Sequence, residues 1–248
     1  YAFRLLLPPD APTNHGLLEP LTVIAPEGTI VNARPPCAVA AGNVETSQRI
    51  VDVVLGALSQ ALPELIPAAS SGTMSNLLLG APPGVHPEWA YYETIAGGAG
   101  GSPAGAGASA IQTHMTNTRS TPVEALEHAL PLRVLRYAIR KSSGGGGVCP
   151  GGDGVVRELE LLAKTEVTLI GERRRRPPYG LSGGGPGAVG EDTLRRGDEV
   201  VRLPGKITFT ARPGDVLTIA TPGGGGFGDP IKKKFWASVL SGEPIKLD

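Results

Sequence analysis

Aromatic residues, cysteine and net charge are all scarce in this 248-residue sequence. Phe, Trp and Tyr together make up 4% of the residues, and there are 2 cysteines. Cys37 and Cys149 lie far apart and form no Cys-x-x-Cys pair, so we expect two reduced thiols in a cytoplasmic protein rather than a disulfide framework. The 23 basic and 23 acidic residues cancel, which argues against binding to nucleic acid or an anionic membrane through overall charge.

Long apolar runs and self-contained catalytic motifs are also absent. No stretch approaches the ~20 apolar residues of a membrane-spanning helix. No glycine cluster leads into Gly-Lys-Ser/Thr, as a phosphate-binding loop would, and His-Glu-x-x-His does not occur. The letters of residues 105–110 match a dinucleotide fingerprint, but glycine precedes them where a strand should end. The sequence therefore contains no nucleotide or metal signature that stands by itself.

Glycine and proline are abundant, with 36 and 24 residues, and they separate short runs that alternate like strands. Two other stretches have the spacing of helices. We therefore predict an α+β fold of mostly antiparallel strands, two main helices and several glycine-rich loops. A shift in composition near Gly144 predicts a mixed region at 1–143, an antiparallel β region at 144–230 and a short helical tail at 231–248. A single domain is the alternative.

The first 42 residues read as three short strands divided by turns. Their sequences are AFRLLL, LTVIA and TIVNA, and Pro26-Glu27-Gly28 separates the last two. Proline presets its own φ and glycine accepts a positive one, so this tripeptide favours a turn.

A helix is predicted at 45–62, where Pro63 ends it. Apolar residues recur on one face at three- and four-residue spacing, which predicts that this face packs against the core. They are Ile50, Val53, Val54, Ala57, Leu58, Ala61 and Leu62. Asn43, Thr46 and Ser47 crowd the start of this helix, where they either cap it or bind an anionic group of a substrate.

Three further strand segments follow the central part of the chain. Residues 131–140 alternate so that Leu135, Tyr137 and Ile139 share a face. Residues 154–170 predict a hairpin, and residues 206–220 predict a second one around Pro213-Gly214-Asp215. In the first hairpin the alternation places one set of apolar side chains on a common face, namely Leu159, Leu161, Val167 and Leu169.

Arg173 to Arg176 form the longest run of like charges. In a strand, successive side chains point to opposite faces, so one pair of arginines could line an anion site. A solvated sheet edge is the alternative.

The stretch from Gly97 to Glu127 combines a glycine-rich loop, a polar cluster and a helix start. His114, Thr116, Asn117, Thr118 and Arg119 offer an imidazole, hydroxyls, an amide and a guanidinium, a set suited to a polar ligand. The helix start is predicted from Thr121 as cap, Pro122 as first residue and Glu124 closing a capping box. The other interpretation is a loop in which these side chains bond only to their own backbone.

Several motifs in fixed order resemble the hydantoinase B/oxoprolinase family. They are GNVETSQRIVDVVLGAL at 42–58, SSGTMSNLLLG at 70–80, YETIAGGAG at 92–100, THMTNTRSTPVEALE at 113–127, LRYAIRKSSGGGG at 135–147, PPYGLSGGGPG at 177–187 and PGGGGFGDP at 222–230. The resemblance spans about residues 1–230 and corresponds to the C-terminal half of a family member. The chain begins with tyrosine, so we expect a processed chain or the later part of a longer one.

The resemblance implies part of the B-type subunit of an ATP-dependent cyclic amidase that opens hydantoin-like or 5-oxoproline rings. An A-type partner subunit would bind ATP, and a divalent metal, of unknown identity, would have its ligands outside this chain. The remainder of the B-type subunit is a further expected partner. Two alternatives stay open, namely a subunit of an ATP-dependent acetone or acetophenone carboxylase and a non-catalytic scaffold for subunit contacts.

The residues to which this chemistry would fall are those of the polar cluster. His114 is the only plausible general base there, and it would move a proton or complete a metal shell. Thr116 and Asn117 would hold a carbonyl or its oxyanion. Arg119, together with Asn43, Thr46 and Ser47, is the predicted substrate-binding set.

Overall fold

The computed structural model of the protein describes residues 1–230, and the predicted helical tail at 231–248 lies outside them. Residues 1–230 contain two α-helices, α1 (Ser47–Leu58) and α2 (Val123–Ala129), with three short helical turns, η1 (Ala2–Leu6), η2 (His15–Leu17) and η3 (Gly42–Thr46). The strands are β1 (Asn76–Gly80), β2 (Ala90–Thr94), β3 (Leu132–Arg140), β4 (Gly154–Leu161), β5 (Thr165–Ile170), β6 (Glu191–Arg196), β7 (Glu199–Leu203), β8 (Lys206–Ala211) and β9 (Val216–Ala220). The predicted α+β fold with mostly β structure is confirmed.

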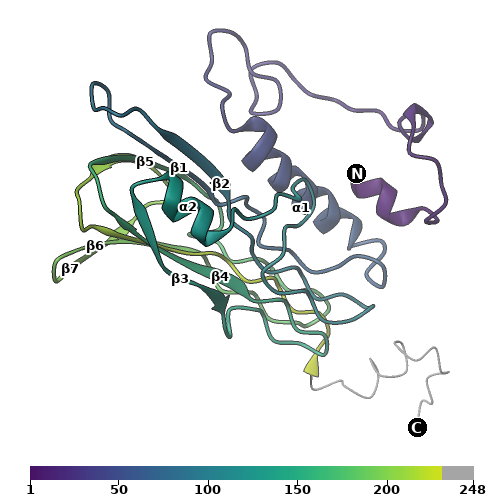
Figure 1. Ribbon diagram of the computed structural model, residues 1–248. Helices are drawn as coiled ribbons and strands as arrows, with labels where there is room; N and C mark the ends of the chain where they lie inside the picture. Colours follow the sequence, from purple (N-terminus) through teal and green to yellow (C-terminus); the bar gives the residue numbers. More distant parts are fainter. Residues whose placement is uncertain (231–248) are drawn as a thin grey trace.

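The strands form two antiparallel sheets with the orders β2-β1-β5-β8 and β3-β4-β9-β6-β7. One apolar cluster joins them: Leu77 and Val167 come from the first sheet, and Leu159 and Leu217 from the second. Each of these four side chains is fully buried. The sheets therefore face each other over a shared core, as Figure 1 shows at left, with α2 lying against them. Both sheets contain strands from either side of residue 144, and the boundary expected there stays a prediction.

Both predicted hairpins are wrong, because their strands lie in different sheets. β4 pairs with β3 and β9, whereas β5 pairs with β1 and β8. β9 likewise joins β4 and β6 rather than β8. The short connections carry the chain from one sheet to the other. Leu159 and Val167 therefore do not share a face of one sheet but point into the same core from opposite sheets. A hairpin that was not predicted joins β6 to β7 through Gly197, which has a φ of +57°.

The amino-terminal segment contains none of the three predicted strands. Residues 2–6 form the 3-10 helix η1, which packs through Ala2 against Val51 and Leu55 of α1. The rest of this segment has no ladder beyond one bridge between Thr29 and Asn32. A strand needs a paired neighbour to satisfy its backbone, and residues 1–42 pair with no strand of either sheet.

The first helix buries a face that only partly overlaps the predicted one. Val54, Leu58 and Leu62 pack against the core as predicted, but Val53 is 64% exposed and Ile50 is 44% exposed, and Val51 and Leu55 are buried instead. Helix α1 is also shorter than predicted, since it begins after the single π-helical turn η3 and ends at Leu58, before Pro63. The helix turns its mixed polar and apolar face inward because hydrogen-bond partners for its polar side chains lie there, as described below.

Two other local predictions are wrong. Thr121 does not cap α2. The N-cap position is Pro122, and no side chain caps the helix. The Thr121 hydroxyl instead accepts a hydrogen bond from the Tyr91 hydroxyl at 3.2 Å. In β3 the predicted apolar face, with Leu135, Tyr137 and Ile139, is the exposed one. A bulge between Val134 and Arg136 shifts the register of this strand, and Leu132 faces the core instead.

Glycine-rich segments form a layer of paired backbones below α1 (Figure 1). Gly152 N–H donates to Ala99 O at 2.8 Å, Gly224 N–H to Gly152 O at 2.9 Å, and Gly145 N–H to Gly224 O at 2.8 Å. A Cβ on Gly98 would lie 1.9 Å from the carbonyl oxygen of Gly152, so only glycine allows this approach. Because glycine permits close backbone approach, the sequence predicts that loops 97–107, 144–152 and 223–228 lie together and line a cleft with the start of the first helix. Their meeting is confirmed, and the shared cleft stays a prediction. The loops pack against one another, and 223–228 is buried.

Two further expectations concern cysteine and membranes. Both cysteines are free, with Cys37 exposed and Cys149 buried, as predicted. Within residues 1–230 no helix has the length and apolar character needed to cross a bilayer. The cytoplasmic location stays a prediction.

Candidate functional site

The inward face of α1 and of the turn before it carries three buried polar side chains, Glu45, Gln48 and Asp52. They are three and four residues apart, so they lie on one side of the helix. Each binds a different segment of the chain. This face therefore joins α1 to the rest of the protein through hydrogen bonds rather than through apolar packing alone.

Glu45 holds the segment that leads into β1. Its carboxylate accepts hydrogen bonds from the Thr73 hydroxyl at 2.8 Å, the Met74 N–H at 2.9 Å and the Asn76 amide at 2.6 Å. Burial raises the pKa of Glu45, although the bonds from Thr73 and Met74 act in the opposite direction. These hydrogen bonds all come from residues 73–76, so Glu45 stabilises the fold by holding that segment to the start of α1.

Asp52 is the centre of the candidate site. Its Oδ2 accepts from Arg173 Nη2 at 2.6 Å and from Arg49 Nη1 at 2.9 Å. Its Oδ1 is buried and has no hydrogen-bond partner among residues 1–230. The Nε2 of His114 lies 3.9 Å from this oxygen. Buried carboxylate oxygens are normally hydrogen-bonded, so an unpaired one facing an imidazole marks the place as a candidate for chemistry.

His114 is nearly buried, with 11% of its side chain exposed, and its backbone has a φ of +56°. Its Nδ1 lies 3.3 Å from the hydroxyl of Tyr1. Burial lowers the pKa of His114, and the smaller effect of the Asp52 charge raises it. The imidazole is therefore neutral near pH 7 and has one nitrogen free to accept a proton.

Gln48 holds the backbone on both sides of His114. Its amide Nε2 donates to the carbonyl oxygen of Thr113 at 2.9 Å, and its Oε1 accepts from the N–H of Met115 at 3.2 Å. The Gln48 side chain is fully buried. A non-glycine residue at positive φ needs surrounding structure that keeps it there, and these two bonds supply it.

Arg173 and Tyr179 close the site on the other side of Asp52. The Tyr179 hydroxyl donates to the backbone carbonyl of Asp52 at 2.8 Å, and the Arg173 guanidinium carbon lies 5.8 Å from the centre of the Tyr179 ring. Burial, followed by the Asp52 charge, raises the pKa of Tyr179 to about 12. Gly72, with a φ of +60°, passes so close that a Cβ there would lie 2.4 Å from Asp52 Oδ2.

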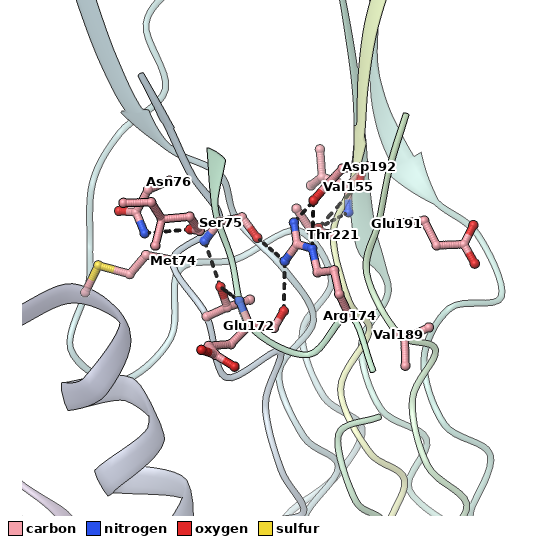
Figure 2. Close-up of polar contacts among 12 residues, drawn as sticks. Met74, Ser75, Asn76, Val155, Glu172, Arg174, Val189, Glu191, Asp192 and Thr221 are labelled. Atoms are coloured by element: carbon pink, nitrogen blue, oxygen red, sulfur yellow. Dashed lines mark hydrogen bonds and ion pairs between the residues drawn. The ribbon is translucent and has the colours of Figure 1, made fainter. Parts of the chain in front are cut away.

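The arginine run is not a solvated sheet edge. It follows β5 as irregular backbone, and its first two side chains are largely buried in ion pairs. Arg173 pairs with Asp52, and Arg174 pairs through two bonds of 3.0 Å with Asp192. Figure 2 shows Arg174 between Ser75, Asp192 and the backbone of Glu172. Because this segment is not a strand, its side chains do not alternate between two faces. The two arginines in ion pairs, Arg173 and Arg174, are therefore adjacent in sequence.

Among the predicted catalytic residues, only His114 reaches this site. Thr116 lies close by in sequence, but its hydroxyl is 3.3 Å from that of Thr118. Asn117 and Arg119 are exposed and have no side-chain hydrogen bond within residues 1–230. Their roles therefore stay predictions.

The residues predicted to bind an anion at the start of the helix form no hydrogen bonds with the His114 segment within residues 1–230. The Ser47 hydroxyl donates to the carbonyl oxygen of Asn43 at 2.9 Å, and none of the three side chains caps the helix. Asn43 is exposed, and Thr46 lines a pocket of about 550 Å³ with the 28–42 segment. No hydrogen bond joins Asn43, Thr46 or Ser47 to residues 114–119 in the described part of the chain. Anion binding there stays a prediction.

Sequence reasoning missed Gln48, Asp52 and Tyr179, and it placed Arg173 in a possible anion site without its partner Asp52. One signal was available, because Glu45, Gln48 and Asp52 recur at helical spacing in line with Leu55. Polar residues in register with an apolar one indicate a buried polar face. Arg173 and Tyr179 gave no such signal, since their contacts with Asp52 join positions more than one hundred residues apart in sequence.

The site does not suit a resident divalent cation. Within residues 1–230 no group of three or more His, Cys, Asp or Glu side chains is arranged to bind a metal. Asp52 and His114 would supply two ligands at most, and the guanidinium groups of Arg49 and Arg173 lie on the same carboxylate and would repel a cation. The expectation that the ligands of any metal lie outside this chain stays a prediction.

Comparison with protein families matches residues 1–230 to Hydantoinase B/oxoprolinase. 5-Oxoprolinase 1 of Arabidopsis thaliana is 42% identical over 232 residues, which are 93% of this chain and 18% of that protein. The B-type subunit of a putative D-/L-hydantoinase from a Pseudomonas species is 32% identical over 228 residues, which are 90% of this chain and 38% of that protein.

Among solved structures, the ATP-dependent caprolactamase of Pseudomonas jessenii is similar to this chain with a TM-score of 0.76 and 26% identity. The match covers 97% of this chain and 45% of that one. The chain thus spans less than half the length of the relatives named here.

Proposed function

The chain belongs to the hydantoinase B/oxoprolinase family, and we propose that it forms part of the B-type component of an ATP-dependent cyclic amidase. Its substrates would be hydantoin-like or 5-oxoproline rings. The relatives support this class of reaction, since they include a 5-oxoprolinase, a component of a hydantoinase and an ATP-dependent caprolactamase.

The observation that carries the proposal is the His114 imidazole beside the unpaired oxygen of Asp52. In ring opening by water, a bond forms between the water oxygen and the ring carbonyl carbon, and the carbon–nitrogen bond of the ring breaks. His114 takes the proton that the water loses and returns it to the departing ring nitrogen. The charge of Asp52, whose Oδ1 lies 3.9 Å from Nε2, favours a proton on Nε2, which leaves Nδ1, 3.3 Å from the exposed Tyr1 hydroxyl, to accept the proton from water.

The flanking polar residues have binding roles in this proposal. Thr116 and the exposed Asn117 donate hydrogen bonds to the carbonyl oxygen as negative charge develops on it. Arg119 binds a carboxylate such as that of 5-oxoproline. Asn43, Thr46 and Ser47 bind a second anionic group beside the pocket that Thr46 lines.

ATP belongs to an A-type partner component in this proposal, because the sequence has no phosphate-binding loop of the Gly-Lys-Ser/Thr kind. Bound there, ATP would supply activation of the ring amide by phosphorylation, which releases ADP, and the transferred phosphoryl group would leave as inorganic phosphate by the end of ring opening. The residues of this chain then position water and move protons at the activated carbonyl carbon.

The test is ATP-dependent turnover by the protein together with its A-type partner. Opening of 5-oxoproline and of hydantoin is followed with the release of ADP. Replacing His114 with Gln should lower turnover about 10²-fold or more, as expected for loss of a general base. His86→Gln is the matched control, because His86 is an exposed histidine in the loop between β1 and β2 and should leave turnover unchanged.

Three results would contradict the proposal. ATP-dependent consumption of acetone or acetophenone with bicarbonate, without ring opening, would favour the carboxylase. No turnover of any of these substrates with the partner present would favour a scaffold. Full ring-opening activity in the His114→Gln variant would remove His114 from the mechanism.

A further inference from the structure

A pocket of about 500 Å³ lies between the segment after β5 and the turn between β7 and β8. Its lining holds six cationic side chains, Arg49, Arg173, Arg174, Arg175, Arg176 and Lys206. Glu172 is the one carboxylate in the lining. The whole chain has no net charge, so this concentration of positive charge is local.

Two of the six cations are matched by carboxylates of their own. Arg174 binds Asp192 through two hydrogen bonds (Figure 2), and Lys206 forms an ion pair with Glu172. These pairs neutralise their cations and hold the two sides of the pocket in place.

The remaining four cations have a single carboxylate among them. Arg49 and Arg173 both donate to Oδ2 of Asp52. Arg175 and Arg176 are exposed and form no ion pair within residues 1–230. The pocket thus has an excess of three positive charges over the carboxylates that bind its lining. Burial lowers the pKa of Arg49 most, and the neighbouring charge of Arg173 lowers it further.

We propose that this pocket binds a small phosphate-bearing anion with about three negative charges, such as a pyrophosphate group or a phosphorylated small molecule. Guanidinium groups present paired N–H donors that match phosphate oxygens, and a single carboxylate would leave most of the excess charge unmatched. The volume is in the range of small-ligand pockets. The inference rests on charge and geometry alone, and it does not depend on the ring-opening reaction.

The test is equilibrium binding of inorganic phosphate, pyrophosphate and ATP to the purified protein by calorimetry. Pyrophosphate should bind more tightly than phosphate. The double variant Arg175→Ala/Arg176→Ala should weaken binding at least about tenfold, since it removes two charge-assisted donors. Both side chains are exposed, so the thermal midpoint should stay the same. The matched control, Arg136→Ala/Arg195→Ala, removes two exposed arginines of β3 and β6 and the same net charge.

Each outcome decides the inference. Equal binding of pyrophosphate and ATP supports recognition of the phosphate groups alone, and ATP binding at least tenfold tighter supports a nucleotide as the source of those groups. Absence of saturable binding for all three probes overturns the inference. So does an equal loss in the variant and its control, because that result reports overall charge. The assay involves no turnover, so failure of the amidase proposal leaves it unaffected.

Discussion

Replacing Gln48 with Leu should release the His114 segment. Leucine keeps the apolar bulk but removes the bonds to Thr113 O at 2.9 Å and from Met115 N at 3.2 Å. A backbone group left unpaired costs about 1–3 kcal/mol, and the surroundings here are only partly buried. We therefore expect the variant to lose about 2–3 kcal/mol of the free energy that opposes opening of this segment. It also loses the two bonds that keep His114 at its positive φ.

The assay is hydrogen exchange of the Met115 amide. If local opening limits exchange, a loss of about 2–3 kcal/mol makes this amide exchange roughly 30-fold to 150-fold faster. Gln60→Leu is the control, because Gln60 lies just beyond α1, is exposed and makes no side-chain hydrogen bond in the described structure. Unchanged exchange at Met115 in the Gln48 variant, or equal acceleration in the control, would refute the positioning role of Gln48.

Three further predictions concern the glycine layer, pH and the proposed oxyanion donor. Gly98→Ala should lower the free energy of unfolding by at least about 3 kcal/mol in urea titrations, because its Cβ would meet the carbonyl oxygen of Gly152 at 1.9 Å. Gly146→Ala, where a Cβ meets nothing within 4 Å, should change it by less than about 0.5 kcal/mol, and equal losses would contradict the packing argument. Because folding lowers the pKa of His114, the unfolded chain binds a proton more readily than the folded one. The stability contributed by His114 is therefore complete above its ordinary pKa of 6.5 and is lost as the pH falls below that value. Unfolding measured against pH should show a smaller acid loss in His114→Gln, and identical profiles would argue against a buried neutral imidazole. Asn117→Ala should reduce turnover of the assembled enzyme at least about tenfold with little change in thermal midpoint, since Asn117 is exposed, and a parallel loss of stability would indicate a role in the turn instead.

Helix α1 shows which features the local sequence pattern could predict and which it could not. Its existence followed from apolar spacing and from Pro63, but its inward face did not. The apolar count favoured the side with Ile50 and Val53, which is exposed. Hydrogen bonds from distant segments to Glu45, Gln48 and Asp52 stabilise the other orientation, and no local pattern contains those partners.

The strands show the same division. Alternation in β4 and β5 correctly predicted which side chains are buried, because the period of two is a property of the strand itself. It did not predict their partners, since pairing depends on which backbone edges meet. The connection between these strands crosses from one sheet to the other, although its length would also fit a hairpin.

The sequence by itself determined the family, the α+β class, the buried faces of β4 and β5 and the meeting of the glycine loops. Each of these depends on residue type at fixed local spacing, or on the absence of a Cβ. Only the tertiary structure decided that His114 lies beside Asp52 and that Gln48 holds the backbone around it. It also decided that, within the described residues 1–230, Arg173 and Arg174 form ion pairs and Arg175 and Arg176 do not. Those contacts join residues far apart in sequence, and burial gives them their strength because charges and hydrogen bonds act more strongly away from water.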